Sequence, residues 1–212
     1  GVEQSGQMET IGFDLYMEML QEELAEIRGQ DIPSVEDTQI DLQVTAFIPG
    51  DWITESDEKM AAYRAASDCI SREALLQLAA DWVDRYGALP APVQSLLQLM
   101  ELKLLAKRCG FARIKPEKPN IVLETPMEEP AFRRLRQGLA THLHGRLVYQ
   151  AGSGTTAKVL ARGLGVLPAE KQLEELKGWL ETMAAQLPDA DGFTEGEREA
   201  ANQDRNEAVL SV

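Results

Sequence analysis

Apolar residues recur at intervals of three and four in several segments of the chain, and this spacing predicts amphipathic helices. The first such helix begins near Phe13 and ends at Gly29, because glycine favours termination there. Three further helices are predicted between residues 56 and 110, another near residues 128–141, and a last one from about Pro168. The apolar stripe of the first helix consists of Phe13, Tyr16, Met17, Leu20, Leu24 and Ile27.

Residues that favour helix ends mark the bounds of the three central helices. Ser56 and Ser71 are each placed to cap a helix N-terminus, because a serine hydroxyl accepts a hydrogen bond from the first turn. The second of these helices ends at Gly87, and the third begins after the prolines of LPAP and ends at Gly110. We therefore expect three consecutive helices joined by short connections.

Alternation of apolar and polar residues predicts strands, most clearly over residues 40–48. Two shorter strand patterns occupy residues 111–114 and 121–124 and are separated by a proline-containing turn. Two more are the sequences GRLVYQ and AKVLAR, joined by the glycine-rich AGSGTT. Since the helices are grouped and the short strands meet as hairpins, we expect an α+β fold with helices gathered around short antiparallel strands.

The charge of the chain limits the ligands that it can take. Among 212 residues, 35 are acidic and 21 are basic, which gives a net charge of −14. Such a surface repels phosphate backbones, so a basic protein surface is the better partner, and solubility alone is an equal explanation. Residues 188–212 contain seven acidic and two basic residues without a helical or strand period, which predicts a disordered acidic tail.

The cysteine content and the apolar runs indicate a compartment. Cys69 and Cys109 are isolated thiols that make no disulfide framework, so we expect a cytoplasmic protein. No apolar run approaches the roughly 20 residues that a membrane-spanning helix needs, and we expect no membrane contact. The chain begins with Gly1 and not with methionine, and its first ten residues are typical of the middle of a longer chain. We therefore expect a fragment or a processed product.

Two patterns that suggest chemistry are weak. GSGTTAK, residues 152–158, lacks the glycine directly before lysine that a phosphate-binding loop requires, so a hairpin turn is the better interpretation. His142 and His144 lie two residues apart at a predicted helix end, where side chains diverge, and we expect no metal site. No nucleophile motif is present, so we expect no enzymatic activity in this chain.

The sequence DWVDRYG carries the most specific local signal. Asp81 and Asp84 lie three residues apart near the C-terminal end of a predicted helix, so both carboxylates share one face. The helix dipole disfavours acidic residues at that end. One interpretation, which the residues alone favour, is a solvated face with a local ion pair between Asp81 and Arg85. The other is a rigid acidic pair that receives an arginine from a partner.

Two long segments resemble bacterial transcription-repair coupling factors (Mfd proteins). GVEQSGQMETIGFDLYMEML resembles the stretch after the helicase core, and DWVDRYGALPAPVQSLLQLMELKLLAKRCG resembles the helix-turn-helix of the C-terminal domain. IDLQVTAFIPGDWI and KMAAYRAAS match that domain in order and spacing. The resemblance implies an end of a translocation motif with a linking helix at residues 1–32 and a C-terminal regulatory domain at residues 33–187. It does not cover the acidic tail at residues 188–212.

The function of that family supplies further expectations. Its members are ATP-dependent translocases on double-stranded DNA that displace stalled RNA polymerase and recruit UvrA. The resemblance implies that the C-terminal domain masks the UvrA-binding surface of an N-terminal UvrB-like module, with Asp81 and Asp84 facing basic residues of that module. Gln4, Ser5 and Gly6 resemble the end of a translocation motif shared with RecG. ATP and Mg²⁺ are implied for the parent motor, and no cofactor is implied for this segment.

The remaining residues of the helix-turn-helix are expected to be structural. Arg85 is a local charge partner, Gly87 is a helix stop, and Pro90 lies at the start of the next helix. With the resemblance included, we expect Asp81 and Asp84 to make a functional contact. Two alternatives remain, a free-standing acidic module that binds another basic protein and a small hydrolase, for which the sequence offers no nucleophile and base.

Overall fold

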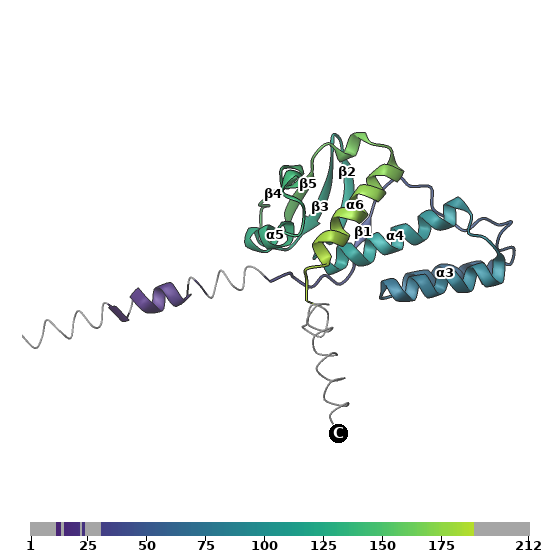
Figure 1. The fold of residues 1–212 in the computed structure, drawn as a ribbon, viewed down its shortest axis with the longest axis horizontal. Coiled ribbons are helices and arrows are strands. Elements are labelled where there is room, and N and C mark those ends of the chain that lie inside the picture. Colours follow the sequence, from purple (N-terminus) through teal and green to yellow (C-terminus); the bar gives the residue numbers. More distant parts are fainter. Residues whose placement is uncertain (1–11, 14, 22, 24–30, 189–212) are drawn as a thin grey trace, which may run out of the picture.

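The structure is a computed structural model that describes residues 12, 13, 15–21, 23 and 31–188. A five-stranded sheet and grouped helices confirm the predicted α+β fold (Figure 1). In chain order the elements are β1 (Gln39–Ile40), α2 (Ser56–Asp68), α3 (Arg72–Tyr86), α4 (Ala91–Arg108), β2 (Arg113–Glu117), β3 (Asn120–Thr125), α5 (Glu129–Arg136), the 3-10 helix η1 (Thr141–Arg146), β4 (Leu147–Gln150), β5 (Ala157–Ala161), the 3-10 helix η2 (Leu164–Val166) and α6 (Ala169–Ala184).

Both predicted hairpins are confirmed in the sheet, whose strand order is β1-β2-β3-β5-β4. Strands β2 and β3 pair antiparallel with Ile114 opposite Leu123, and β4 and β5 pair antiparallel with Tyr149 opposite Val159. The glycine-rich residues 151–156 connect β4 to β5, as the hairpin interpretation predicts. This loop follows one strand and precedes another, whereas a phosphate-binding loop precedes a helix.

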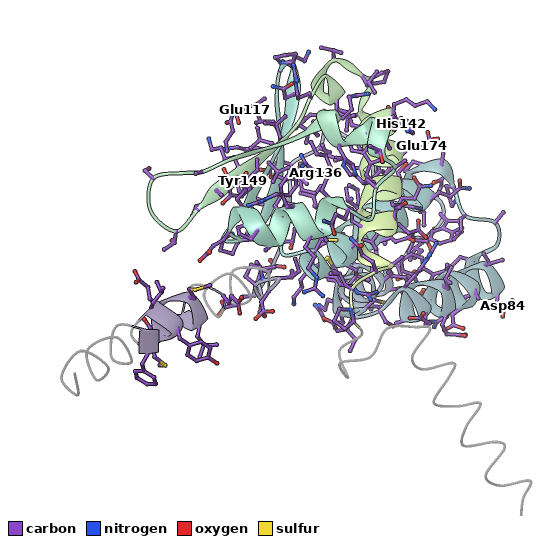
Figure 2. The ribbon with its side chains drawn as sticks, turned by 60° about the vertical axis from the view of Figure 1, so that its left-hand side comes forward. Asp84, Glu117, Arg136, His142, Tyr149 and Glu174 are labelled. Carbon is purple, nitrogen blue, oxygen red and sulfur yellow. The ribbon has the colours of Figure 1, made fainter. Side chains whose placement is uncertain are left out.

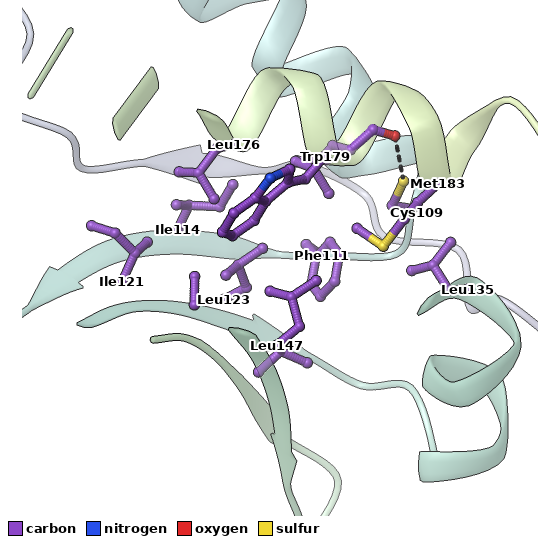
Figure 3. Close-up of a cluster of buried hydrophobic side chains, with 14 of the residues drawn as sticks. Cys109, Phe111, Ile114, Ile121, Leu123, Leu135, Leu147, Leu176, Trp179 and Met183 are labelled. Carbon is purple, nitrogen blue, oxygen red and sulfur yellow. Dashed lines mark hydrogen bonds between the residues drawn. The ribbon is translucent and has the colours of Figure 1, made fainter. Parts of the chain in front are cut away.

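The larger of two hydrophobic cores lies between one face of the sheet and helices α4, α5 and α6 (Figure 3). Alternate strand residues point into it, as expected for a sheet with one covered face. Its fully buried members include Phe111, Ile114, Ile121, Leu123, Phe132, Leu135, Leu147, Val159, Leu164, Leu173 and Leu176. The opposite face of the sheet carries ion pairs, between Arg113 and Asp41 at 2.7 Å and between Lys115 and Glu124 at 2.9 Å.

The smaller core joins α2, α3 and the first half of α4. Its buried members are Ile48, Ile53, Ala62, Ala66, Trp82, Val93 and Leu96. Helix α4 continues into the larger core, where Leu102 and Ala106 are fully buried. One 18-residue helix therefore belongs to both cores and fixes α3 relative to the sheet.

The predicted strand over residues 40–48 is wrong in length, because only Gln39 and Ile40 pair in the sheet. The rest of this segment still alternates between buried and exposed side chains. Leu42 packs in the larger core and Ile48 in the smaller one. At the far end the Ile48 N–H donates a hydrogen bond of 2.8 Å to the Tyr63 hydroxyl, so the segment bridges two cores without a partner strand.

Two helix boundaries also differ from the prediction. Ser56 is the first residue of α2 and not its cap, because Glu55 takes the cap position. The helix predicted near residues 128–141 ends at Arg136, where α5 stops, and His142 and His144 lie in the separate helix η1. Gly138 intervenes and packs closely against Met183 and Gln186 of the α6 region, so a side chain there would require these residues to shift.

The described residues between 12 and 23 are helical, as predicted. Within this predicted stripe, Phe13 and Tyr16 are 63% and 62% exposed, and Met17 and Leu20 are partly buried. Gly29, where that helix was predicted to end, and the predicted acidic tail from Asp189 onward lie outside the described residues.

Candidate interdomain contact surface

Helix α3 is held by the smaller core along one side. Leu75 and Trp82 are buried, seven residues apart, so the same face of the helix turns inward at both points. The Trp82 ring meets the Trp52 ring edge-on with centroids 6.0 Å apart, and the Tyr86 ring lies 5.3 Å from Trp52. These aromatic contacts fix the rotation of α3 about its axis and decide which residues face outward.

Both ends of α3 are capped. The Ser71 hydroxyl accepts a hydrogen bond of 3.1 Å from the Ala74 N–H, as the sequence predicts. At the other end Gly87 has a φ of +86° and its N–H donates to the Val83 carbonyl at 2.9 Å. The Pro90 carbonyl then accepts from the first turn of α4, so the two helices are joined by a short, ordered connection.

Ion pairs join the start of α3 to two other helices. The Arg72 guanidinium lies 2.8 Å from a carboxylate oxygen of Glu101 on α4 and 2.6 Å from one of Glu181 on α6. Lys177 of α6 reaches the second oxygen of Glu101 at 3.0 Å. Hydrogen bonding to Glu181 and the charge of Glu101 raise the pKa of Arg72 above its ordinary value. This network ties α3, α4 and α6 together.

Asp81 and Asp84 lie on the exposed side of α3, and Figure 2 shows Asp84 at the edge of the molecule. Asp81 accepts a hydrogen bond of 3.0 Å from the Gln77 amide. The ion pair between Asp81 and Arg85 that the spacing allows is not formed, because the Arg85 guanidinium lies over the Tyr86 ring, 5.6 Å from its centroid. Within residues 31–188, neither aspartate has a cationic partner.

Two apolar side chains share this exposed side. Leu76 is 64% exposed and Val83 is 43% exposed, and their spacing of seven residues places both on one flank of this exposed side. We call Leu76, Asp81, Val83 and Asp84 the outer face of α3. Sequence reasoning found its acids but missed its apolar residues, although REALLQLAADWVDRY holds a second apolar stripe beside the buried one.

Other residues predicted for sites are separate from this face. Gln4, Ser5 and Gly6 lie outside the described residues. His142 is exposed, whereas His144 is partly buried with its Nε2 atom 2.9 Å from the Leu139 carbonyl oxygen. Across the described ranges, no cluster of three or more histidine, cysteine or acidic residues is placed to hold a metal ion. None of the helices in those ranges is long and apolar enough to cross a membrane.

Comparison with known proteins gives the same family over the central part of the chain. The model of the TRCF domain matches residues 42–132, a segment that contains α3. The transcription-repair-coupling factor of Escherichia coli is 31% identical over 58% of this chain, which spans 11% of that protein's length. The Haemophilus influenzae protein is 35% identical over 54% of this chain, which spans 10% of its length. The Bacillus subtilis protein is 26% identical over 88% of this chain and 15% of its own length.

A solved structure supports the fold. It is described as a crystal structure of the C-terminal domain of transcription-repair coupling factor, and it aligns with a TM-score of 0.55 and 17% identity over 72% of this chain and 95% of that chain. At this identity the likeness concerns the fold alone. The chain is therefore homologous, over about half of its length, to transcription-repair-coupling factors, and it shares the fold of a C-terminal domain of such a factor.

Proposed function

We propose that this chain is the C-terminal regulatory part of a transcription-repair coupling factor, and that the outer face of α3 binds a basic surface of the UvrB-like module of the same protein. The observation that carries the proposal is the exposed pair Asp81 and Asp84, which has no cationic partner within residues 31–188. An arginine from a partner can bridge two carboxylates on one helix face. Leu76 and Val83 add apolar area on the same exposed side of α3.

The rigidity of α3 supports this role. A contact surface binds more tightly when its groups are already placed, because less conformational entropy is lost on association. The caps at Ser71 and Gly87 and the ion pairs of Arg72 hold α3 in place before any partner arrives. The face thus presents two charges at a fixed spacing.

The mechanism is a shift between a closed and an open state. In the closed state the domain covers the surface of the UvrB-like module that binds UvrA. Engagement of the parent motor with RNA polymerase and double-stranded DNA, driven by ATP and Mg²⁺ in that motor, favours the open state. A contact of a few charges and two apolar side chains is of a size that such an event can break.

The proposal is tested by titrating the 212-residue chain into the isolated UvrB-like module and measuring heat. Asp81→Ala with Asp84→Ala is expected to weaken binding at least tenfold, since each lost charge-assisted hydrogen bond contributes about 1.5–3 kcal/mol. Leu76→Ser with Val83→Ser is expected to weaken it by a smaller factor.

Asp68→Ala with Glu175→Ala removes the same charge from exposed positions on α2 and α6 and serves as the control. This control is expected to bind as the unchanged chain does. Equal affinity of all four proteins, or no heat with the unchanged chain, would refute a contact through α3.

A further inference from the structure

The charge of this acidic chain is distributed very unevenly. Residues 130–162 contain six cationic side chains and no acidic one, in a protein whose net charge is −14. The six are Arg133, Arg134, Arg136, Arg146, Lys158 and Arg162. Four of them come from α5 and the end of η1, which follow one another in the chain. An anionic segment is attracted to this basic region and repelled by the acidic remainder of the molecule, so the basic region is its preferred contact.

The cationic side chains of α5 and η1 lie on two adjoining elements. Arg133 and Arg134 are exposed on α5 and form no ion pair within residues 31–188, although Glu128 and Glu129 precede them. The Arg136 guanidinium donates at 3.5 Å to the His144 carbonyl, which joins α5 to η1. We call Arg133, Arg134, Arg136 and Arg146 the basic surface.

The acidic tail leaves the fold beside this surface. The Gln186 amide donates to the carbonyls of Arg134 at 3.2 Å and Leu135 at 2.7 Å, so the end of the described chain is fastened to α5. Asp189 and Asp191 follow within five residues, at most about 17 Å along an extended chain. The tail of residues 189–212 carries seven acidic and two basic side chains, a net charge of −5.

We propose that residues 189–212 dock on the basic surface of the same molecule. Opposite charges, the fixed starting point at Gln186 and the short path to Asp189 and Asp191 together give the tail a high effective concentration there. The contact is electrostatic and exposed, so it weakens as salt shortens the screening length from about 30 Å at 0.01 M to about 3 Å at 1 M. A docked tail shields the basic surface from phosphate backbones.

The test uses the full 212-residue chain with a nitroxide spin label in the tail. Ala200→Cys carries the label in a Cys69→Ser background, while Cys109 is fully buried and does not react. Amide signals of residues 133–146 are expected to lose at least half of their intensity at 20 mM NaCl and to recover it at 500 mM. Signals of α2, on the other core, are expected to keep their intensity.

Charge variants decide whether the basic surface is responsible. Arg133→Glu with Arg134→Glu is expected to restore the signals at 20 mM NaCl. Both side chains are exposed and make no contact that the fold requires. Arg64→Glu with Lys118→Glu makes the same change of charge at exposed positions on α2 and the β2–β3 turn, and it is expected to leave the signal loss unchanged.

Several results would overturn the proposal. One is signal loss spread evenly over the surface, and another is signal loss centred on Lys115 and Lys158, on the face of the sheet away from the larger core. A third is signal loss that persists in the variant Arg133→Glu with Arg134→Glu. In a mixture, the spin label and the isotope can be placed on different molecules. Signal loss that occurs only in such a mixture would assign the basic surface to the tail of a second copy. Signal shifts of the basic surface on adding a 20-base-pair DNA duplex, with no effect of the label, would assign it to phosphate.

Discussion

The side-chain amide of Gln77 donates a hydrogen bond of 3.0 Å to the carboxylate of Asp81, one helical turn away. An amide carries no net charge, so this hydrogen bond orients the Asp81 carboxylate without supplying a cation to it. The cation that could have neutralised it, Arg85, lies instead against the Tyr86 ring. Within residues 31–188 the fold therefore orients Asp81 and places no cation beside it.

Trp82 should be the main anchor of α3. Trp82 is 5% exposed and its ring packs against Trp52, so Trp82→Ala is expected to lower the free energy of unfolding by about 3–5 kcal/mol. The neighbouring Val83→Ala removes an exposed side chain and is expected to cost less than about 1 kcal/mol. Urea unfolding followed by circular dichroism measures both. Similar costs for the two variants would show that α3 is not held by this core.

Two glycine substitutions should change the free energy of unfolding in opposite directions. Gly87 has a φ of +86° and a ψ of −168°, a conformation in which a side chain is strained although no atom obstructs it, so Gly87→Ala is expected to destabilise by about 1–3 kcal/mol. Gly178 lies on α6 with open space around it, and Gly178→Ala is expected to stabilise by about 0.5–1 kcal/mol. Thermal unfolding of both variants tests this. A stabilising Gly87→Ala would contradict the assigned end of α3.

The Cys109 thiol should make the free energy of unfolding depend on pH in alkaline solution. Burial raises the pKa of its thiol from 9.0 to about 12, so the unfolded chain loses this proton at lower pH than the folded chain. The stabilisation that the protonated Cys109 thiol contributes to the folded state is fully present below pH 9. It is lost as the pH rises toward 12, and the free energy of unfolding then falls by up to about 1.4 kcal/mol per pH unit.

Urea midpoints between pH 7.5 and 10.5 measure this effect. Cys109→Ala costs packing at every pH but removes the titrating group, so its stability should fall less steeply than that of the unchanged chain. Parallel curves for the two proteins would mean that the Cys109 thiol ionises as readily in the folded state as in the unfolded one.

Local patterns predicted much of the fold. The hairpins of β2–β3 and β4–β5 follow from short alternating runs around tight turns, and the cap at Ser71 follows from its place before an apolar stripe. The segment over residues 40–48 shows where this reasoning fails. Its alternation arises because Leu42 and Ile48 enter two different cores, and alternation reports burial of side chains and not the presence of a partner strand.

The outer face of α3 was predictable only in part. The spacing of Asp81 and Asp84 places both acids on one side of any helix. Whether that side is exposed depends on the rings of Trp52, Trp82 and Tyr86, which come together only in the tertiary structure. The exposure of Leu76 and the position of Arg85 over Tyr86 depend on the same packing, so no local pattern could have given them.

The most direct test of the central claim is the affinity of the complete parent protein for UvrA. We predict that Asp81→Ala with Asp84→Ala opens the protein and strengthens UvrA binding at least tenfold, because the outer face of α3 no longer holds the UvrB-like module. The control Asp68→Ala with Glu175→Ala should bind UvrA as the unchanged protein does. UvrA binding by the Asp81 and Asp84 variant that stays as weak as that of the unchanged protein would contradict the claim.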